Sequence, residues 1–91
     1  MSCHARLSNS LLGEWELYIV IDGTDSKDWP VHDFRRTVPV PTLGERAEAL
    51  TALGFEPTDG AGWEWRELSY TFTERAYLTA TLAVRRIGGA A

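Results

Sequence analysis

The stretch Pro41-Thr42-Leu43-Gly44-Glu45 begins a segment that closes at Leu53-Gly54-Phe55, and both ends are typical of a single α-helix. Thr42 stands where an N-cap side chain accepts a hydrogen bond from the first turn, and Glu45 completes a capping box. Gly54 stands where a left-handed residue ends a helix. The stretch therefore predicts one helix with a defined beginning and a defined end.

The predicted helix runs from about Leu43 to Leu53, and Pro57 prevents its continuation. Its apolar residues fall near one stripe at helical spacing. The members of this stripe are Leu43, Ala47, Leu50 and Leu53. Phe55 is expected to pack back on Leu50, which is the hydrophobic contact that accompanies this type of helix end.

The runs on either side of the helix alternate between apolar and polar residues, as strands do. The expected strands are residues 3–9, 14–21, 29–40, 63–73 and 77–86. The second should pair as a hairpin with the third, which Pro39 and Pro41 place at a sheet edge. The pattern predicts an α+β fold of order βββαββ, with a mostly antiparallel five-stranded sheet and one helix.

The size and composition of the chain limit its class. Its 91 residues predict one domain over residues 1–87 with a flexible tail at 88–91. Cys3 is the only cysteine, so no disulfide forms within one chain, and few soft ligands are present for a metal. We expect no metal and no cofactor. The net charge of −4 argues against nucleic acid as a partner. The free cysteine and the lack of a long apolar run predict a cytoplasmic protein without a membrane partner.

The predicted helix is too small to cover the predicted sheet. Eleven residues of helix are about 16 Å long and about 10 Å wide, whereas five strands span about 20–24 Å. Either the sheet curls strongly or a second molecule covers the remainder. Since small domains often gain stability by association, a homodimer or another protein partner is expected.

Aromatic residues are the candidates for an interaction surface. Trp15 is expected in the core, whereas Trp63 and Trp65 suit either the core or a recognition patch. A β-bulge near Glu67 would bring both tryptophans to the face of Leu68, and without it they point away from the helix. Tyr18, Tyr77, Trp63 and Trp65 form the predicted interaction surface.

A second candidate site is a small-molecule pocket near Trp29, His32 and Asp33. An acid beside a histidine suits acid–base chemistry near neutral pH. However, neighbouring residues of a strand point to opposite faces, which argues against contact between His32 and Asp33. No catalytic residue is assigned. A binder or minor enzyme with this pocket is the alternative to a non-enzymatic module.

The remaining charged groups favour ordinary surface roles. The acidic stretch at residues 22–28 lacks the ligand pattern of a calcium loop and is read as a solvated turn. The pairs Arg35-Arg36 and Arg85-Arg86 would form a basic stripe if their outward members align with Arg66. Cross-strand pairing with Glu64 and Glu67 would neutralise this stripe, and that reading is favoured.

Several short motifs resemble a known family. They are Gly13-Glu14-Trp15-Glu16-Leu17-Tyr18, Trp29-Pro30, Val38-Pro39-Val40-Pro41-Thr42, Ala52-Leu53-Gly54-Phe55-Glu56-Pro57 and Trp63-Glu64-Trp65. Together they resemble a family of short actinobacterial proteins of unknown function. The resemblance covers most of the chain and implies no activity or site. We expect a non-enzymatic interaction or accessory module that self-associates through an aromatic sheet face or a sheet edge.

Overall fold

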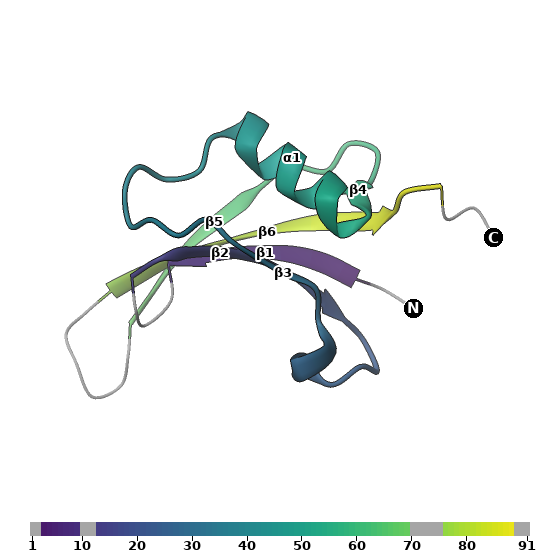
Figure 1. Ribbon diagram of the computed structural model, residues 1–91, viewed down its shortest axis with the longest axis horizontal. Coiled ribbons are helices and arrows are strands. Elements are labelled where there is room, and N and C mark those ends of the chain that lie inside the picture. The colour runs from purple at the N-terminus through teal and green to yellow at the C-terminus, as the bar shows by residue number, and fades with distance from the viewer. Residues whose placement is uncertain (1–2, 10–12, 70–75, 89–91) are drawn as a thin grey trace.

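The computed structural model describes residues 3–9, 13–69 and 76–88. Its elements are β1 (Cys3–Asn9), β2 (Trp15–Ile21), the short 3-10 helix η1 (Ser26–Asp28), β3 (Val31–Asp33), α1 (Leu43–Leu53), β4 (Phe55–Pro57), β5 (Glu64–Ser69) and β6 (Ala76–Arg86). Figure 1 shows α1 lying over one side of the sheet. We call this side the helix side and the other the helix-free side.

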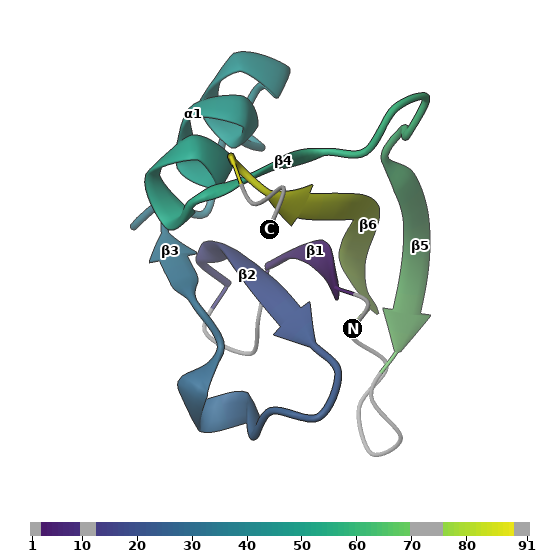
Figure 2. The same cartoon turned by 90° about the vertical axis from the view of Figure 1, so that its right-hand side faces the viewer.

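The sheet is antiparallel, with the strand order β3-β2-β1-β6-β4, and β5 also pairs with β6. The first half of β6 pairs with β5 and the second half with β4, so these two strands share one edge of β6. Figure 2 shows β3, β2, β1, β6 and β5 following one another around the curled sheet. The predicted α+β class with one helix is confirmed.

Two strand predictions need correction. The sequence predicts no strand between the helix and residue 63, but Phe55–Pro57 is strand β4, which pairs with Arg86, Arg85 and Val84. The expected strand over residues 29–40 is reduced to Val31–Asp33. Its place at the sheet edge and its pairing with β2 are confirmed. The expected extension of β5 to residue 73 lies outside the described residues.

The segment after β3 leaves the regular ladder because Arg35 adopts a left-handed conformation with φ 56°. The chain still follows the start of β2. The Phe34 N–H donates to the Trp15 carbonyl, and the Trp15 N–H donates to the Arg36 carbonyl, both over 2.9 Å. This irregular path leads the chain from the sheet edge to the beginning of α1.

Both ends of α1 form as the sequence predicts. The Glu45 N–H donates to Thr42 Oγ1 over 3.1 Å, and the Thr42 N–H donates to Glu45 Oε1 over 2.9 Å. Gly54 has φ 91°, and its N–H bonds to the carbonyls of Leu50 and Thr51. Arg36 holds the Glu45 carboxylate through both Nη atoms, over 2.7 and 2.6 Å. This bidentate hydrogen bond, together with the Thr42 N–H, lowers the pKa of Glu45 to about 2.

The buried stripe of α1 differs from the predicted one. Arg46, Ala49 and Leu50 are buried, whereas Leu43 is 67 % exposed and Ala47 is exposed. The helix is therefore rotated so that a charged side chain faces the sheet. The stem of Arg46 covers apolar surface there, and the guanidinium finds partners described below.

The core lies between α1 and the helix side of the sheet. Its buried members are Ala5, Leu7, Trp15, Leu17, Ile19, Ala49, Leu50, Phe55, Ala80, Leu82 and Val84. The prediction that Trp15 is a core residue is confirmed, since it is 2 % exposed and its Nε1 donates to the Thr37 carbonyl. Phe55 and Leu50, which the helix-end pattern predicts to be in contact, both belong to this core.

Candidate functional site

An aromatic cluster with one cation closes the helix side of the sheet near the first turns of α1. The Arg46 guanidinium carbon lies 5.2 Å from the Trp63 ring centroid and 5.6 Å from that of Trp65. Trp65 also meets Trp15 edge-on, with the centroids 6.2 Å apart. Burial lowers the pKa of Arg46, and its Nε donates to the carbonyls of Pro41 and Thr42. Trp65 is nevertheless 44 % exposed.

The predicted interaction surface is not gathered on one face. The β5–β6 register is unbroken from Glu64 to Ser69, so the bulge near Glu67 that the sequence left open is absent there. The expectation that the two tryptophans then point away from the helix is wrong, because both contact Arg46 of α1. Trp63 and Trp65 lie on the helix side, whereas Tyr18 alternates with the buried Leu17 and Ile19 and faces the helix-free side. The side chain of Tyr77 lies outside the part of the chain that the structure describes. Strand alternation alone could not decide which face of β5 the helix covers.

The three residues of the predicted small-molecule pocket have separate partners. Trp29 stacks on Tyr18 with the ring centroids 6.1 Å apart, and its Nε1 donates to the Thr24 carbonyl. His32 packs edge-on against Phe34 at 4.7 Å. Asp33 Oδ1 accepts a hydrogen bond from the Arg35 N–H. The structure therefore brings Trp29 to Tyr18 rather than to the other two residues.

The predicted basic pairs do not form a stripe with Arg66. Arg36 binds Glu45, and Arg85 binds Glu56 over 2.8 Å and Asp59 over 3.5 Å. The Arg86 guanidinium lies over the Phe55 ring. Pairing with carboxylates does neutralise two of these arginines, but Glu64 and Glu67 are not the partners. For Arg85 the reason is that β4, which the sequence analysis missed, carries Glu56 directly opposite it. For Arg36 the partner is Glu45 at the first turn of α1.

The helix-free side carries a polar hollow of about 300 Å³ over four strands. It is lined by Arg6, Ser8, Tyr18, Glu64, Arg66, Leu68, Thr79 and Thr81. Strand register arranges most of these side chains in two parallel rows. One row runs from Tyr18 on β2 through Arg6 and Thr81 to Glu64 on β5. The other runs through Ser8 and Thr79 to Arg66.

The floor of this hollow contains an unsatisfied hydroxyl group. Thr79 is only 5 % exposed, and its Oγ1 is buried without a hydrogen-bond partner. Leaving such a group unpaired costs about 1–3 kcal/mol. The guanidinium groups of Arg6 and Arg66 form no hydrogen bond or ion pair with other residues in the described ranges. The hollow therefore offers cationic and hydroxyl donors that the folded chain does not use.

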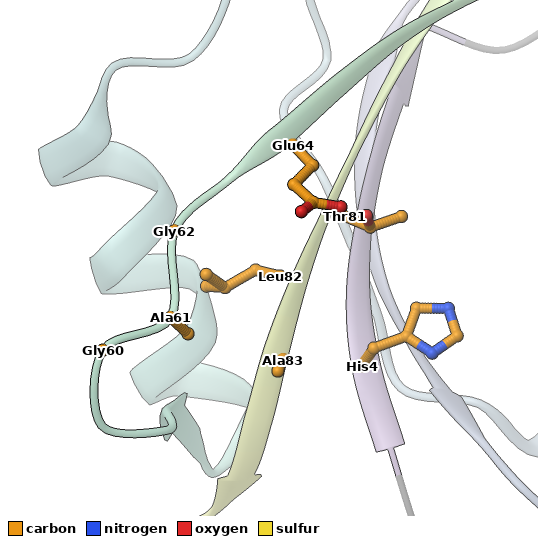
Figure 3. Close-up of a pocket in the computed structure, with 8 residues that line it drawn as sticks. All are labelled: His4, Gly60, Ala61, Gly62, Glu64, Thr81, Leu82 and Ala83. Carbon is orange, nitrogen blue, oxygen red and sulfur yellow. The ribbon is translucent and has the colours of Figure 1, made fainter.

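A second hollow, of about 510 Å³, adjoins the first and shares Glu64 and Thr81 with it. It forms where the loop at residues 60–62 passes β6 between the parts paired with β4 and β5. Figure 3 shows Glu64 directed towards Thr81, with His4 nearby on β1. Burial and then Arg6 lower the pKa of His4, whereas Asp22 raises it. The lowered pKa favours the neutral form of the His4 imidazole at physiological pH.

The described residues limit the chemistry of this site. Among residues 3–9, 13–69 and 76–88, no group of three or more His, Cys, Asp or Glu side chains is placed to hold a metal ion. In the same ranges, no helix is long and apolar enough to cross a membrane. The hollows present hydroxyl groups, two guanidinium groups and one carboxylate, which suits binding by hydrogen bonds and charge.

The sequence analysis missed Arg6, Ser8, Thr79 and Thr81 as candidate site residues. The alternation of β6 does predict that Thr79 and Thr81 point away from the core. Outward threonines are common in strands, so this signal does not single them out. Only the pairing of β6 with β1 and β5 brings them beside the two arginines.

Comparison with known proteins places the chain in a family. No curated protein and no solved structure matches it significantly. A family model described as a family of unknown function, DUF6303, matches residues 1–91. The chain therefore belongs to the family of unknown function DUF6303.

Proposed function

We propose that this protein is a non-enzymatic interaction module that self-associates through the outer edge of β5. The observation that carries the proposal is the open edge of this strand. β5 pairs with β6 on one side, and no strand in the described ranges pairs with its other side. An open strand edge is a template for a further strand, because its N–H and C=O groups have no ladder partner.

The sequence of β5 is complementary to itself at this edge. A second copy related by a two-fold axis would pair antiparallel, and equal faces of the two sheets would continue one another. Centred on Trp65, this pairing sets Trp65 against Trp65 of the other copy on the helix side. It also sets Glu64 of each copy against Arg66 of the other on the helix-free side. Opposite charges and aromatic pairs directly across a ladder are both stabilising.

The neighbouring registers oppose like charges. A pairing centred on Arg66 faces the two copies of Arg66, and one centred on Glu67 faces two carboxylates. A pairing centred on Glu64 faces the two copies of the Glu64 carboxylate. Like charges directly opposite are destabilising, so they select the register centred on Trp65.

The position of Trp65 also supports the outer edge of β5 as the interface. Trp65 is 44 % exposed although it touches Trp15 and Arg46. Its ring is therefore held in place before association, which reduces the entropy lost on binding. Tryptophan is enriched among residues that dominate interfaces. In this proposal Trp65 is the anchor, and Trp63 supports it from within the cluster around Arg46.

Charge reversal in β5 tests the proposal. Wild-type protein is expected to dimerise in sedimentation equilibrium. Arg66→Glu and Glu64→Arg each replace opposite charges by like charges, and each is expected to weaken dimerisation at least about 10-fold. Mixing the two variants restores opposite charges at every pair, and a heterodimer is expected.

Folding controls separate this effect from damage to the chain. Glu64 and Arg66 are exposed and face threonines on β6, so the single variants should retain the circular dichroism spectrum and melting behaviour of a folded monomer. Arg35→Glu changes the net charge equally at a site away from β5 and should leave the dimer intact. A wild-type monomer at high concentration, or single variants that dimerise as well as wild type, would refute the proposal.

We further propose that the protein acts in the cytoplasm of an actinobacterial host, with a copy of itself or another protein as partner. The free Cys3 supports a reducing compartment. The net charge of −4 supports a protein partner over nucleic acid. The candidate pocket at Trp29, His32 and Asp33 gains no support from geometry, because its members contact separate neighbours.

A further inference from the structure

The polar hollow on the helix-free side combines three donor groups, from three strands, that have no partner among the described residues. Arg6 comes from β1, Arg66 from β5, and the buried Thr79 hydroxyl from β6 between them. Thr79 lies directly opposite Arg66 in the ladder and diagonally from Arg6. Arg6 and Arg66 therefore lie on the two strands that pair with β6 on either side of Thr79.

These two arginines differ from most others in the described ranges. Arg36 and Arg85 are bound to carboxylates, and Arg46 and Arg86 lie over aromatic rings. The Arg35 guanidinium also has no partner among the described residues, but it belongs to an exposed loop and lines neither hollow. Among the described residues, Arg6 and Arg66 are the arginines that have no partner within the chain and also line a hollow. In the proposed dimer Arg66 would face Glu64 of the other copy, so a ligand bound at Arg66 would compete with β5 pairing.

We propose that this hollow binds the carboxylate or phosphate group of a small molecule. A guanidinium group matches the two oxygens of such a group with parallel hydrogen bonds. The Thr79 hydroxyl would donate a further hydrogen bond and lose its unsatisfied state. Because Thr79 is only 5 % exposed, the side chains around its hydroxyl group would shift to admit the ligand.

The charge of the lining and the volume of the hollow restrict the class of ligand. The lining holds Arg6 and Arg66 against the single carboxylate of Glu64, so it is locally positive in a chain of net charge −4. A volume of about 300 Å³ is at the lower end of the range for small-molecule sites. Arg6, Thr81 and Glu64 lie in one row across β1, β6 and β5. The Glu64 carboxylate could therefore accept a hydrogen bond from a donor group at the other end of the ligand.

Thermal unfolding in the presence of inorganic phosphate tests the site, with sodium chloride at equal ionic strength as reference. A ligand that binds only the folded state raises the melting temperature as its concentration rises. Wild-type protein should show this rise with phosphate, with acetate, or with both, and the larger shift identifies the preferred oxyanion. The Arg6→Gln variant should need about 10-fold more phosphate than wild type for the same rise in melting temperature.

Thr79→Val provides a variant that keeps the shape of the side chain. Without phosphate it should melt at or above the wild-type temperature, because an unsatisfied hydroxyl group is removed. Phosphate should raise the melting temperature of this variant less than it raises that of wild type. Arg35→Gln removes the same charge outside the hollow and should respond like wild type.

NMR locates the effect without depending on a variant. Phosphate should shift the backbone amide signals of Arg6, Thr79 and Thr81 and leave those of Ala49 and Leu50 in place. No shift beyond that of chloride, or an equal rise in melting temperature for Arg6→Gln, would overturn the proposal. All lining residues belong to one chain, so wild-type protein should still bind phosphate at dilutions where it is a monomer, even if β5 pairing fails.

Discussion

The two sides of the sheet are built from the same strands but have opposite character. On β2, Leu17 and Ile19 are fully buried under α1, whereas Tyr18 and Val20, which alternate with them, remain half-buried on the helix-free side. On the helix side, the buried cation Arg46 has hydrogen-bond acceptors and aromatic rings around it. On the helix-free side, the buried Thr79 hydroxyl has no partner. The two buried polar groups therefore differ in their partners. The Arg46 guanidinium is satisfied within the packed side, whereas the Thr79 hydroxyl group on the open side is left for the proposed ligand.

The largest expected effect separates the two sides directly. Leu17→Ala removes a fully buried side chain from the core and should lower the free energy of unfolding by about 2–5 kcal/mol. Val20→Ala on the same strand removes a half-buried side chain from the helix-free side and should cost less. Urea unfolding of both variants measures the difference, and equal losses would contradict the division between a packed side and an open side.

A second, smaller effect tests how the helix side accommodates charge. Arg46→Met keeps much of the apolar stem but removes the guanidinium from Trp63 and Trp65 and the donor from the Pro41 carbonyl. We expect a loss of about 1–3 kcal/mol. Tryptophan fluorescence during urea unfolding reports the change. A variant as stable as wild type would show that the guanidinium only fills space.

The smallest expected effect concerns the contact that fixes the beginning of α1. The pKa of Glu45 is lowered from 4.5 to about 2, so its ionised form stabilises the fold. This contribution is present above pH 4.5 and is lost as the pH falls from 4.5 towards 2. Glu45→Gln should therefore melt below wild type at neutral pH, and the difference should shrink across that acidic range.

Glu48→Gln is the matched control for this pH dependence. Glu48 is an exposed carboxylate of the same helix and forms no ion pair with any residue in the described ranges. Its melting temperature should follow that of wild type from neutral to acidic pH. A gap between Glu45→Gln and wild type that stays constant down to pH 2 would mean that Arg36 and Thr42 do not act through the ionised carboxylate.

Local signals predicted the helix, because its caps depend on residues close in sequence. Thr42, Glu45 and Gly54 act within their own turns, and the observed bounds of α1 match the predicted ones. The buried stripe was wrong in part because Arg46 depends on Trp63 and Trp65, which follow it by more than a dozen positions in the chain. The spacing of apolar residues within the helix contains no information about partners so distant in the sequence.

Long-range pairing explains the other differences. Phe55–Pro57 has a proline at its end and too few residues for a visible alternation, and it is a strand only because Arg86 and its neighbours lie opposite. The polar hollow has the same origin. Arg6, Thr79 and Arg66 occupy ordinary outward positions on three strands, and they become a candidate site only through the ladder that joins them.

The pairing of β1 with β6 has a consequence for how the protein is made. His4 lies opposite Ala83, and Leu7 lies opposite Ala80, so the middle of the sheet joins the first and the last strands of the described part of the chain. A nascent chain on the ribosome cannot close this ladder until β6 has emerged from the exit tunnel. Until then β1 and β2 form at most a hairpin, which is marginally stable in water. Cooperative folding must therefore await release of the last strand, and distant contacts of this kind slow the final step.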